Sequence, residues 1–136
     1  MNFDDLSEIY RQEMRSTGLT QTSRRLYEDM AEYVVSLKRE YDSAFDADPE
    51  SAMTDGARQR YRKASRLMDD IHRIRGQKVI RLAAVSNTLG TAPESVQGLP
   101  QIERDLFDTV ARPLNEFDTG FGRIIDAATS DGRDAE

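Results

Sequence analysis

The sequence predicts an all-α fold, an elongated bundle of about four to five helices. Apolar residues recur every three or four positions along most of the 136 residues, which places them on one face of a helix. Strand signals are nearly absent, because Val34-Val35 and Val79-Ile80 both lie inside helical periodicity. Charged residues make up 32% of the chain and hydrophobic residues 38%, so we expect a core built from narrow apolar stripes.

The first two helices are predicted from apolar stripes over residues 3–14 and 26–44. A Ser16-Thr17-Gly18 stop follows the first stripe, and Thr20 or Thr22 would cap the start of the second helix. Pro49 cannot continue a helical hydrogen-bond ladder, so we expect the second helix to end before it.

The third helix is predicted over residues 54–89, where Gly90 and Pro93 close it. Residues 90–98 are small and polar and indicate a loop. The last helix begins at Pro100, a residue type that is favoured in the first turn of a helix.

Pro113 lies inside the apolar pattern of the last helix, and Gly120 and Gly122 follow it, so we expect a kink or a short break there. We place a helical domain at residues 1–128 and a frayed acidic tail at residues 129–136. The apolar face of the last helix continues at Leu114, Phe117, Phe121, Ile124 and Ile125. The residues expected in the core or in an interface are Leu26, Tyr27, Tyr33, Leu37, Ile71, Val79, Leu82, Leu106 and Phe107.

Several classes of protein are excluded by composition. No apolar run approaches the roughly 18 residues that cross a bilayer, and the acidic start of the chain is not a secretory signal. The absence of Cys excludes a disulfide framework, a thiolate zinc site and a Cys nucleophile. We therefore expect a cytoplasmic protein that binds no metal or other cofactor and does not contact a membrane.

Charge is divided unevenly along this chain of net charge −6. The stretch 58–81 holds nine basic residues against Asp69 and Asp70, a charge of +7 that leaves −13 for the rest. On a helix, six of these cations share the face opposite the apolar stripe, which is either a solvated face or a contact for an acidic partner or nucleic acid. The six are Arg58, Arg62, Lys63, Arg66, Arg73 and Arg81.

Arg75 and Lys78 differ from those six, because helical spacing places both of them inside the apolar arc. An unpaired buried cation is far more costly than one that is hydrogen-bonded to a carboxylate. Either the two side chains extend past the edge of the core, or they pair with carboxylates. Those carboxylates would come from another helix of the chain or from another subunit.

Four stretches of the sequence, in order, resemble archaeal GINS replication proteins of the type in which the helical domain comes first. Residues 71–83 match a segment in which an Arg precedes a Lys, a β-branched pair and an Ala. Residues 10–16, followed by Leu19, resemble the family's first helix and its Glu-x-x-Ser turn. Residues 26–40 are similar to its second helix, and residues 98–107 to the start of its last helix.

The resemblance implies a non-enzymatic function in DNA replication. GINS subunits assemble through their helical domains, as four chains in archaea, which here implies a heterotetramer or a homotetramer. The complex binds the MCM helicase and a RecJ-like protein at the replication fork, which implies a nucleoid-associated location. The family's small β-rich domain is not evident in this sequence, so the chain corresponds to a helical domain alone or to a reduced form.

Three other functions stay open from the residues themselves. The chain could be a stand-alone helical protein-binding module, or the basic face could bind DNA directly. Glu28, Asp29 and Glu32 resemble half of the magnesium-binding face of an all-α nucleotide pyrophosphatase, without a second carboxylate pair at a convincing spacing. His72, with Asp69 one turn before it, is interpreted as a surface histidine, and no phosphate-binding loop is present.

Overall fold

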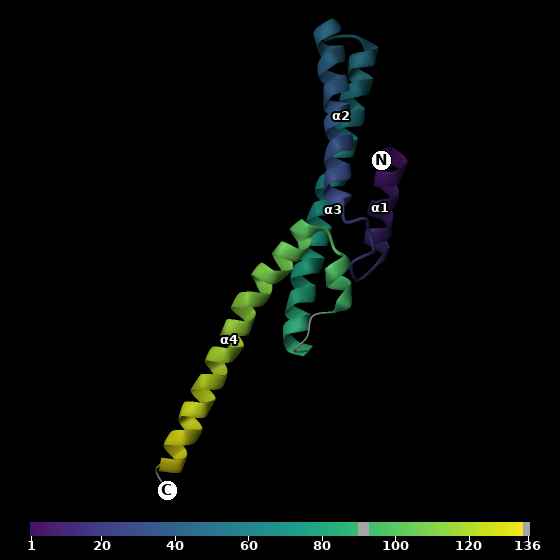
Figure 1. Ribbon diagram of the computed structural model, residues 1–136. Coiled ribbons are helices and arrows are strands. Elements are labelled where there is room, and N and C mark those ends of the chain that lie inside the picture. The colour runs from purple at the N-terminus through teal and green to yellow at the C-terminus, as the bar shows by residue number, and fades with distance from the viewer. Residues whose placement is uncertain (90–92, 135–136) are drawn as a thin grey trace.

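The computed structural model describes residues 1–89 and 93–134, and within them it contains helices and no strand (Figure 1). The all-α prediction is confirmed. No helix of this described part is long and apolar enough to cross a membrane. The elements are α1 (Phe3–Arg15), α2 (Leu26–Ala47), α3 (Ala52–Leu89), the short 3-10 helix η1 (Glu94–Gly98) and α4 (Gln101–Asp134).

Helix α3 is the element against which α1, α2 and α4 all pack. Figure 1 shows α2 and the first part of α3 as a long antiparallel pair, with α1 beside them. After α3, the chain reverses through η1, and α4 starts near the middle of α3. The second half of α4 then extends away from the other helices, so that the C-terminus lies far from α1 (Figure 1).

The first helix begins with a reciprocal cap. The Asn2 side chain accepts a hydrogen bond from the Asp5 backbone N–H at 2.8 Å, and the Asn2 N–H donates to the Asp5 carboxylate at 3.0 Å. The helix ends at Arg15, before the predicted stop at Ser16. The predicted caps of α2 are wrong, because its N-cap residue is Arg25 and no side-chain hydrogen bond caps it. Thr20 instead uses its hydroxyl to contact α1, as described below.

A buried threonine closes the turn between α2 and α3. Helix α2 ends at Ala47, before Pro49, as predicted. The Thr54 hydroxyl lies 2.9 Å from the carbonyl oxygen of Ala44 and 2.6 Å from that of Asp48. Both carbonyls lie at the C-terminal end of α2, where the regular pattern of helical hydrogen bonds stops. The Ser51 hydroxyl accepts from the Thr54 N–H at 3.1 Å, so α3 begins at Ala52, slightly before the predicted start.

Two apolar clusters lie along α3. The first joins α1, α2 and the first part of α3, and includes Leu6, Met30 and Ile71. The second joins the last part of α3 to η1 and α4, and includes Val79 and Phe107. All nine residues expected in the core or in an interface pack in one of the two clusters. These are Leu26, Tyr27, Tyr33, Leu37 and Ile71 in the first, and Val79, Leu82, Leu106 and Phe107 in the second.

Three expectations for the C-terminal third are corrected. Residues 94–98 form η1 instead of a loop, because Val96 and the following Leu99 are buried in the second cluster; residues 90–92 of that loop lie outside the described part. Of the kink or short break expected at Pro113, the break is absent, because α4 continues through this residue and one missing N–H leaves the neighbouring hydrogen bonds of a long helix in place. The expected tail is helical as far as Asp134, and residues 135–136 are not described.

Candidate functional site

Arg75 is the centre of a buried ionic network that joins three helices. Its side chain is fully buried. Its Nε donates to Glu103 Oε2 at 2.7 Å and its Nη2 to Glu103 Oε1 at 2.8 Å, a bidentate pair between α3 and α4. Its Nη1 donates to Glu13 Oε2 of α1 at 2.8 Å and to the Thr20 carbonyl at 3.1 Å. One guanidinium therefore fixes α1, α4 and the α1–α2 connection to α3.

Lys78, one turn further along α3, completes the network at the end of α1. Its Nζ donates to Glu13 Oε1 at 2.7 Å. The backbone carbonyls of Glu13, Ser16 and Gly18 lie 2.7, 2.9 and 2.9 Å from the same nitrogen. A cation at the C-terminus of a helix satisfies carbonyls that have no intrahelical partner and complements the helix dipole. Lys78 thus holds the turn that follows α1.

Two neutral side chains supply the remaining hydrogen bonds of this network. The Thr20 hydroxyl donates to Glu13 Oε2 at 2.6 Å, and the Tyr27 hydroxyl donates to Glu103 Oε2 at 2.7 Å. Two cations and two carboxylates then balance in charge. Such a balanced and hydrogen-bonded group avoids the cost of an unpaired buried charge.

The protonation behaviour of the network follows from its contacts. Burial acts to raise the pKa of Glu13, but the hydrogen bonds from Lys78 and Thr20 and the charge of Arg75 outweigh burial, so the pKa is lowered. Burial, and then the hydrogen bond to the Glu103 carboxylate, raise the pKa of Tyr27. Burial acts to lower the pKa of Arg75, but its contacts with Glu103 and Glu13 raise it. Glu13 and Arg75 therefore remain ionised at neutral pH.

The prediction for Arg75 and Lys78 is resolved in favour of pairing within one chain. Sequence reasoning did not identify Glu13 and Glu103 as their partners. Each carboxylate lies in an apolar stripe, Glu13 seven residues after the buried Leu6 and Glu103 four residues before the buried Phe107. A carboxylate at a core position opposite a cation at a core position is the signal that would have identified both.

The basic face of α3 lies opposite its core contacts, as predicted. Arg62, Lys63 and Arg66 are exposed, and they have no ion pair within residues 1–89 and 93–134. Arg73 is exposed and pairs with Asp70 at 3.2 Å, while Arg81 is exposed further along the helix. Arg58 differs, because it is only partly exposed and its Nε donates to the Tyr41 hydroxyl at 3.2 Å.

The residues considered for catalysis make structural contacts. His72 is exposed, and its ring packs edge-on against Tyr27 with centroids 5.9 Å apart. Asp29 and Glu32 both pair with Arg25, at 3.7 and 3.3 Å. Within the described ranges, no three His, Cys, Asp or Glu side chains are grouped so that they could hold a metal ion.

The second half of α4 exposes a row of large apolar side chains, which we call the distal apolar face. It consists of the exposed Phe117, Phe121, Ile124 and Ile125 and of the half-buried Leu114 at its start. Phe117 is 76% exposed and Ile124 is 68% exposed, whereas Phe107 and Val110 of the same helix pack into the second cluster. The apolar stripe predicted for this helix is therefore covered by α3 in its first part and open in its second.

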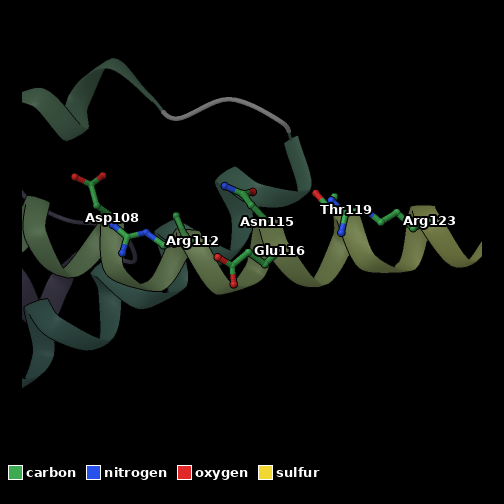
Figure 2. Close-up of a pocket in the computed structure, with 7 residues that line it drawn as sticks. Asp108, Arg112, Asn115, Glu116, Thr119 and Arg123 are labelled. Atoms are coloured by element: carbon green, nitrogen blue, oxygen red, sulfur yellow. The ribbon is translucent and has the colours of Figure 1, made fainter.

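Two of the surface depressions bear on the search for a catalytic site. One, of about 500 Å³, runs along α4 and is lined by side chains of that helix alone, so it is an open groove (Figure 2). Its lining includes Asp108, Arg112, Glu116 and Arg123, which are spread along the helix and do not converge on one point (Figure 2). The other, of about 520 Å³, lies between the α1–α2 connection and η1. Neither presents converging catalytic groups.

Comparison of the chain with protein-family models, with curated proteins and with solved structures gives no match in any of the three.

Proposed function

We propose that this protein is a non-enzymatic assembly subunit of a GINS-type replication complex. In this role it joins companion GINS subunits through its helices and connects the MCM helicase with a RecJ-like protein, at the nucleoid in the cytoplasm. The observation that carries the proposal is the distal apolar face, which extends beyond the core that the chain forms by itself.

The distal apolar face has the chemistry of a protein-binding surface. Isolated exposed apolar residues are ordinary, but a contiguous row of large ones marks an interaction site. Here two phenylalanines and two isoleucines lie on one side of one helix, each at least 48% exposed. Burying a side chain of this size contributes about 1.5–3 kcal/mol, so a partner that covers the row gains a substantial contact.

The arrangement of the core supports the family proposed. The four stretches that resemble GINS proteins are far apart in the sequence, yet each supplies a member of one buried network. Glu13 comes from the first, Tyr27 from the second, Arg75 from the third and Glu103 from the last. The resembling residues therefore act together in holding the helices in place, as a shared helical domain requires.

Co-purification tests this function. The full chain would be mixed with a companion GINS subunit, with MCM and with a RecJ-like protein, and retention on the immobilised chain would be measured. We expect retention by the wild-type chain, loss of retention with Phe117→Asp, and retention with Thr119→Asp, which adds the same charge to the exposed opposite face of α4. If the wild-type chain retains none of the three proteins, the proposal is wrong.

Direct binding of nucleic acid is a second candidate, favoured by the cluster of Arg62, Lys63 and Arg66. These exposed cations lie within about one turn of α3, where their charges add. Phosphate contacts by such a cluster make affinity fall steeply between about 50 and 200 mM salt. Anisotropy of a labelled duplex would be measured with the wild-type chain and with Arg66→Glu. Binding that is absent at low salt removes this candidate.

A further inference from the structure

We infer that the depression between the α1–α2 connection and η1 binds an extended, basic segment of a partner protein. We call this depression the connection cleft. Its volume is about 520 Å³, which falls within the range of about 300–1,000 Å³ that is usual for ligand pockets. Five consecutive residues of the connection, 19–23, line one side of it, and η1 lines the other. The cleft is separate from the distal apolar face, so the inference does not depend on the function proposed above.

The connection has backbone groups that the fold does not use. Residues 19–23 run without a helix, turn or bend. At Thr20 both backbone groups face the ionic network, because the N–H donates to Glu13 at 3.4 Å and the carbonyl accepts from Arg75 at 3.1 Å. In an extended segment the backbone groups of successive residues point to opposite edges, so those of Gln21 lie on the other edge. Within residues 1–89 and 93–134, the backbone N–H and C=O of Gln21 have no hydrogen-bond partner.

This unpaired edge fits the main chain of a partner. An exposed strand edge can bind an extended peptide through main-chain hydrogen bonds, while pockets for the peptide side chains give specificity. In an antiparallel pairing, one residue exchanges both of its hydrogen bonds with the residue opposite. Gln21 lines the cleft and offers both groups, and the hydroxyl residues Thr22, Ser23 and Ser95 line the same cleft. The connection cleft therefore has the chemistry of a site for a peptide backbone.

Apolar side chains and one glycine shape the cleft. Leu19, Leu82 and Leu99 line it, and all three also pack in the second apolar cluster. Gly98 lines it as well, and a Cβ built on Gly98 would meet no atom of the described residues within 4 Å. Its backbone is not in the left-handed region, so neither φ nor close packing requires a glycine there. The missing side chain leaves room for an apolar side chain of a bound segment.

Charge indicates which segment is favoured. Among the described residues that line the connection cleft, Glu94 alone is ionisable, and it is exposed. A smaller depression of about 160 Å³ shares Leu19 and Leu82 with the cleft, and Lys78 and Arg81 line that depression. The cations therefore belong to the neighbouring depression and not to the cleft. A segment with a basic side chain near Glu94 and an apolar side chain over the leucines is complementary to this distribution.

Titration of the full, isotope-labelled chain with a defined peptide tests the site by amide NMR. The probe is the acetylated and amidated peptide Thr-Val-Lys-Val-Thr, whose β-branched residues favour an extended backbone and whose lysine supplies one positive charge. We expect saturable shifts of the amide signals that are largest at residues 19–23 and 94–99. Signals that do not move, or that move mainly in α4, overturn the inference.

Charge reversal tests the basic character of the partner. The peptide Thr-Val-Glu-Val-Thr should bind the wild-type chain about two- to fivefold more weakly than the lysine peptide, the effect of one exposed ion pair. In Glu94→Lys the order of the two peptides should reverse. In Glu116→Lys, which makes the same change at an exposed position of α4, the order should stay as in the wild-type chain. Equal affinity of the wild-type chain for both peptides would show that the favoured segment is not basic.

Filling the cleft tests where the peptide lies. Gly98→Leu should abolish binding of the lysine peptide, because the new side chain occupies the cleft. Gly76→Leu should bind as the wild-type chain does, since Gly76 is an equally open glycine of α3 outside the cleft. Thermal melting of both variants checks that the fold is intact. Binding that survives Gly98→Leu overturns the location.

Methylation of the peptide backbone tests the main-chain pairing. A lysine peptide with methylated backbone nitrogens should bind about tenfold more weakly, because its main-chain donors are lost. Unchanged affinity would mean that side chains alone hold the peptide, and main-chain pairing with Gln21 would then be wrong.

Discussion

Arg75 and Glu103 form a bidentate pair in which both carboxylate oxygens of Glu103 accept from the guanidinium, at 2.7 and 2.8 Å, with both side chains buried. Arg75 lies one turn of α3 after Ile71, which belongs to the first apolar cluster, and one turn before Val79, which belongs to the second. The ionic network is therefore the junction between two apolar cores, and its loss would affect both.

Replacing Arg75 by Met should lower the free energy of unfolding by about 3–5 kcal/mol, the effect of removing one partner from a buried ion pair. The physical reason is that Glu13 and Glu103 would remain buried with only Lys78 as a cation. Urea denaturation followed by circular dichroism measures the change.

Arg73→Met is the matched control, since Arg73 pairs with Asp70 on the exposed face of the same helix. Its cost should be about 0–1 kcal/mol, as for other surface ion pairs. Equal effects of the two substitutions would show that the buried network does not hold the helices together.

Stability should fall on acidification in a way that depends on Glu13. Because the pKa of Glu13 is lower in the folded chain than in the unfolded chain, the stabilisation is complete at neutral pH. It declines from about pH 4.5 downward, as the unfolded chain takes up a proton before the folded chain does. Glu13→Gln should make the acid limb of the stability curve shallower.

The comparison for Glu13 uses slopes and not absolute stabilities, because the Gln variant also leaves Lys78 less well compensated. Glu8→Gln is the control. Glu8 is an exposed glutamate of the same helix whose pKa is also lowered, first by its hydrogen bond with Arg11. An acid limb with the same slope in the wild-type and Glu13→Gln chains would contradict this prediction.

Tyr27→Phe should destabilise the chain by about 1.5–3 kcal/mol, the range for a hydrogen bond to a charged group. The hydroxyl of Tyr27 is one of the donors to the Glu103 carboxylate, and its loss leaves that buried carboxylate with Arg75 alone. The midpoint of urea unfolding is the measurement.

Tyr33→Phe is the control for Tyr27, because Tyr33 is a partly buried tyrosine of α2 whose hydroxyl makes no hydrogen bond to the described residues. The Tyr27 pKa is raised in the folded chain, so the folded chain should also lose stability above about pH 10, where tyrosines of the unfolded chain ionise. If Tyr27→Phe and Tyr33→Phe lower the free energy of unfolding equally, the effect of Tyr27→Phe is due to packing alone.

The apolar periodicity was sufficient to predict the helices and most of the core, because apolar residues that recur at helical spacing lie on one face of a helix. It also identified Arg75 and Lys78 as cations in apolar positions. It could not identify Glu13 and Glu103 as their partners, because the pairing depends on how α1 and α4 pack against α3. Glu13 lies 65 residues before Lys78, and Glu103 lies 28 residues after Arg75.

The wrong predictions fall where a local sequence preference is outweighed by tertiary contacts. Thr20 is a good helix cap in isolation, but its hydroxyl has a stronger acceptor in the buried Glu13 carboxylate. Residues 94–98 are small and polar, yet Val96 and the adjacent Leu99 are buried and draw the segment into a 3-10 turn. Tertiary contacts decided both outcomes, and such contacts are not visible in a local pattern.

Pro113 offers a direct test of how α4 is held, because the helix continues through a residue that normally ends one. Proline lacks the N–H that would bond to the carbonyl of Thr109, and in a helix interior it costs about 3 kcal/mol relative to alanine. Pro113→Ala should therefore slow amide hydrogen exchange of the α4 residues that follow it by at least about tenfold, corresponding to about 1.4 kcal/mol. Asn115→Ala, at an exposed position of the same helix, should change exchange far less. Exchange that is equally slow before and after Pro113→Ala would mean that the proline does not limit the stability of the segment that bears the distal apolar face.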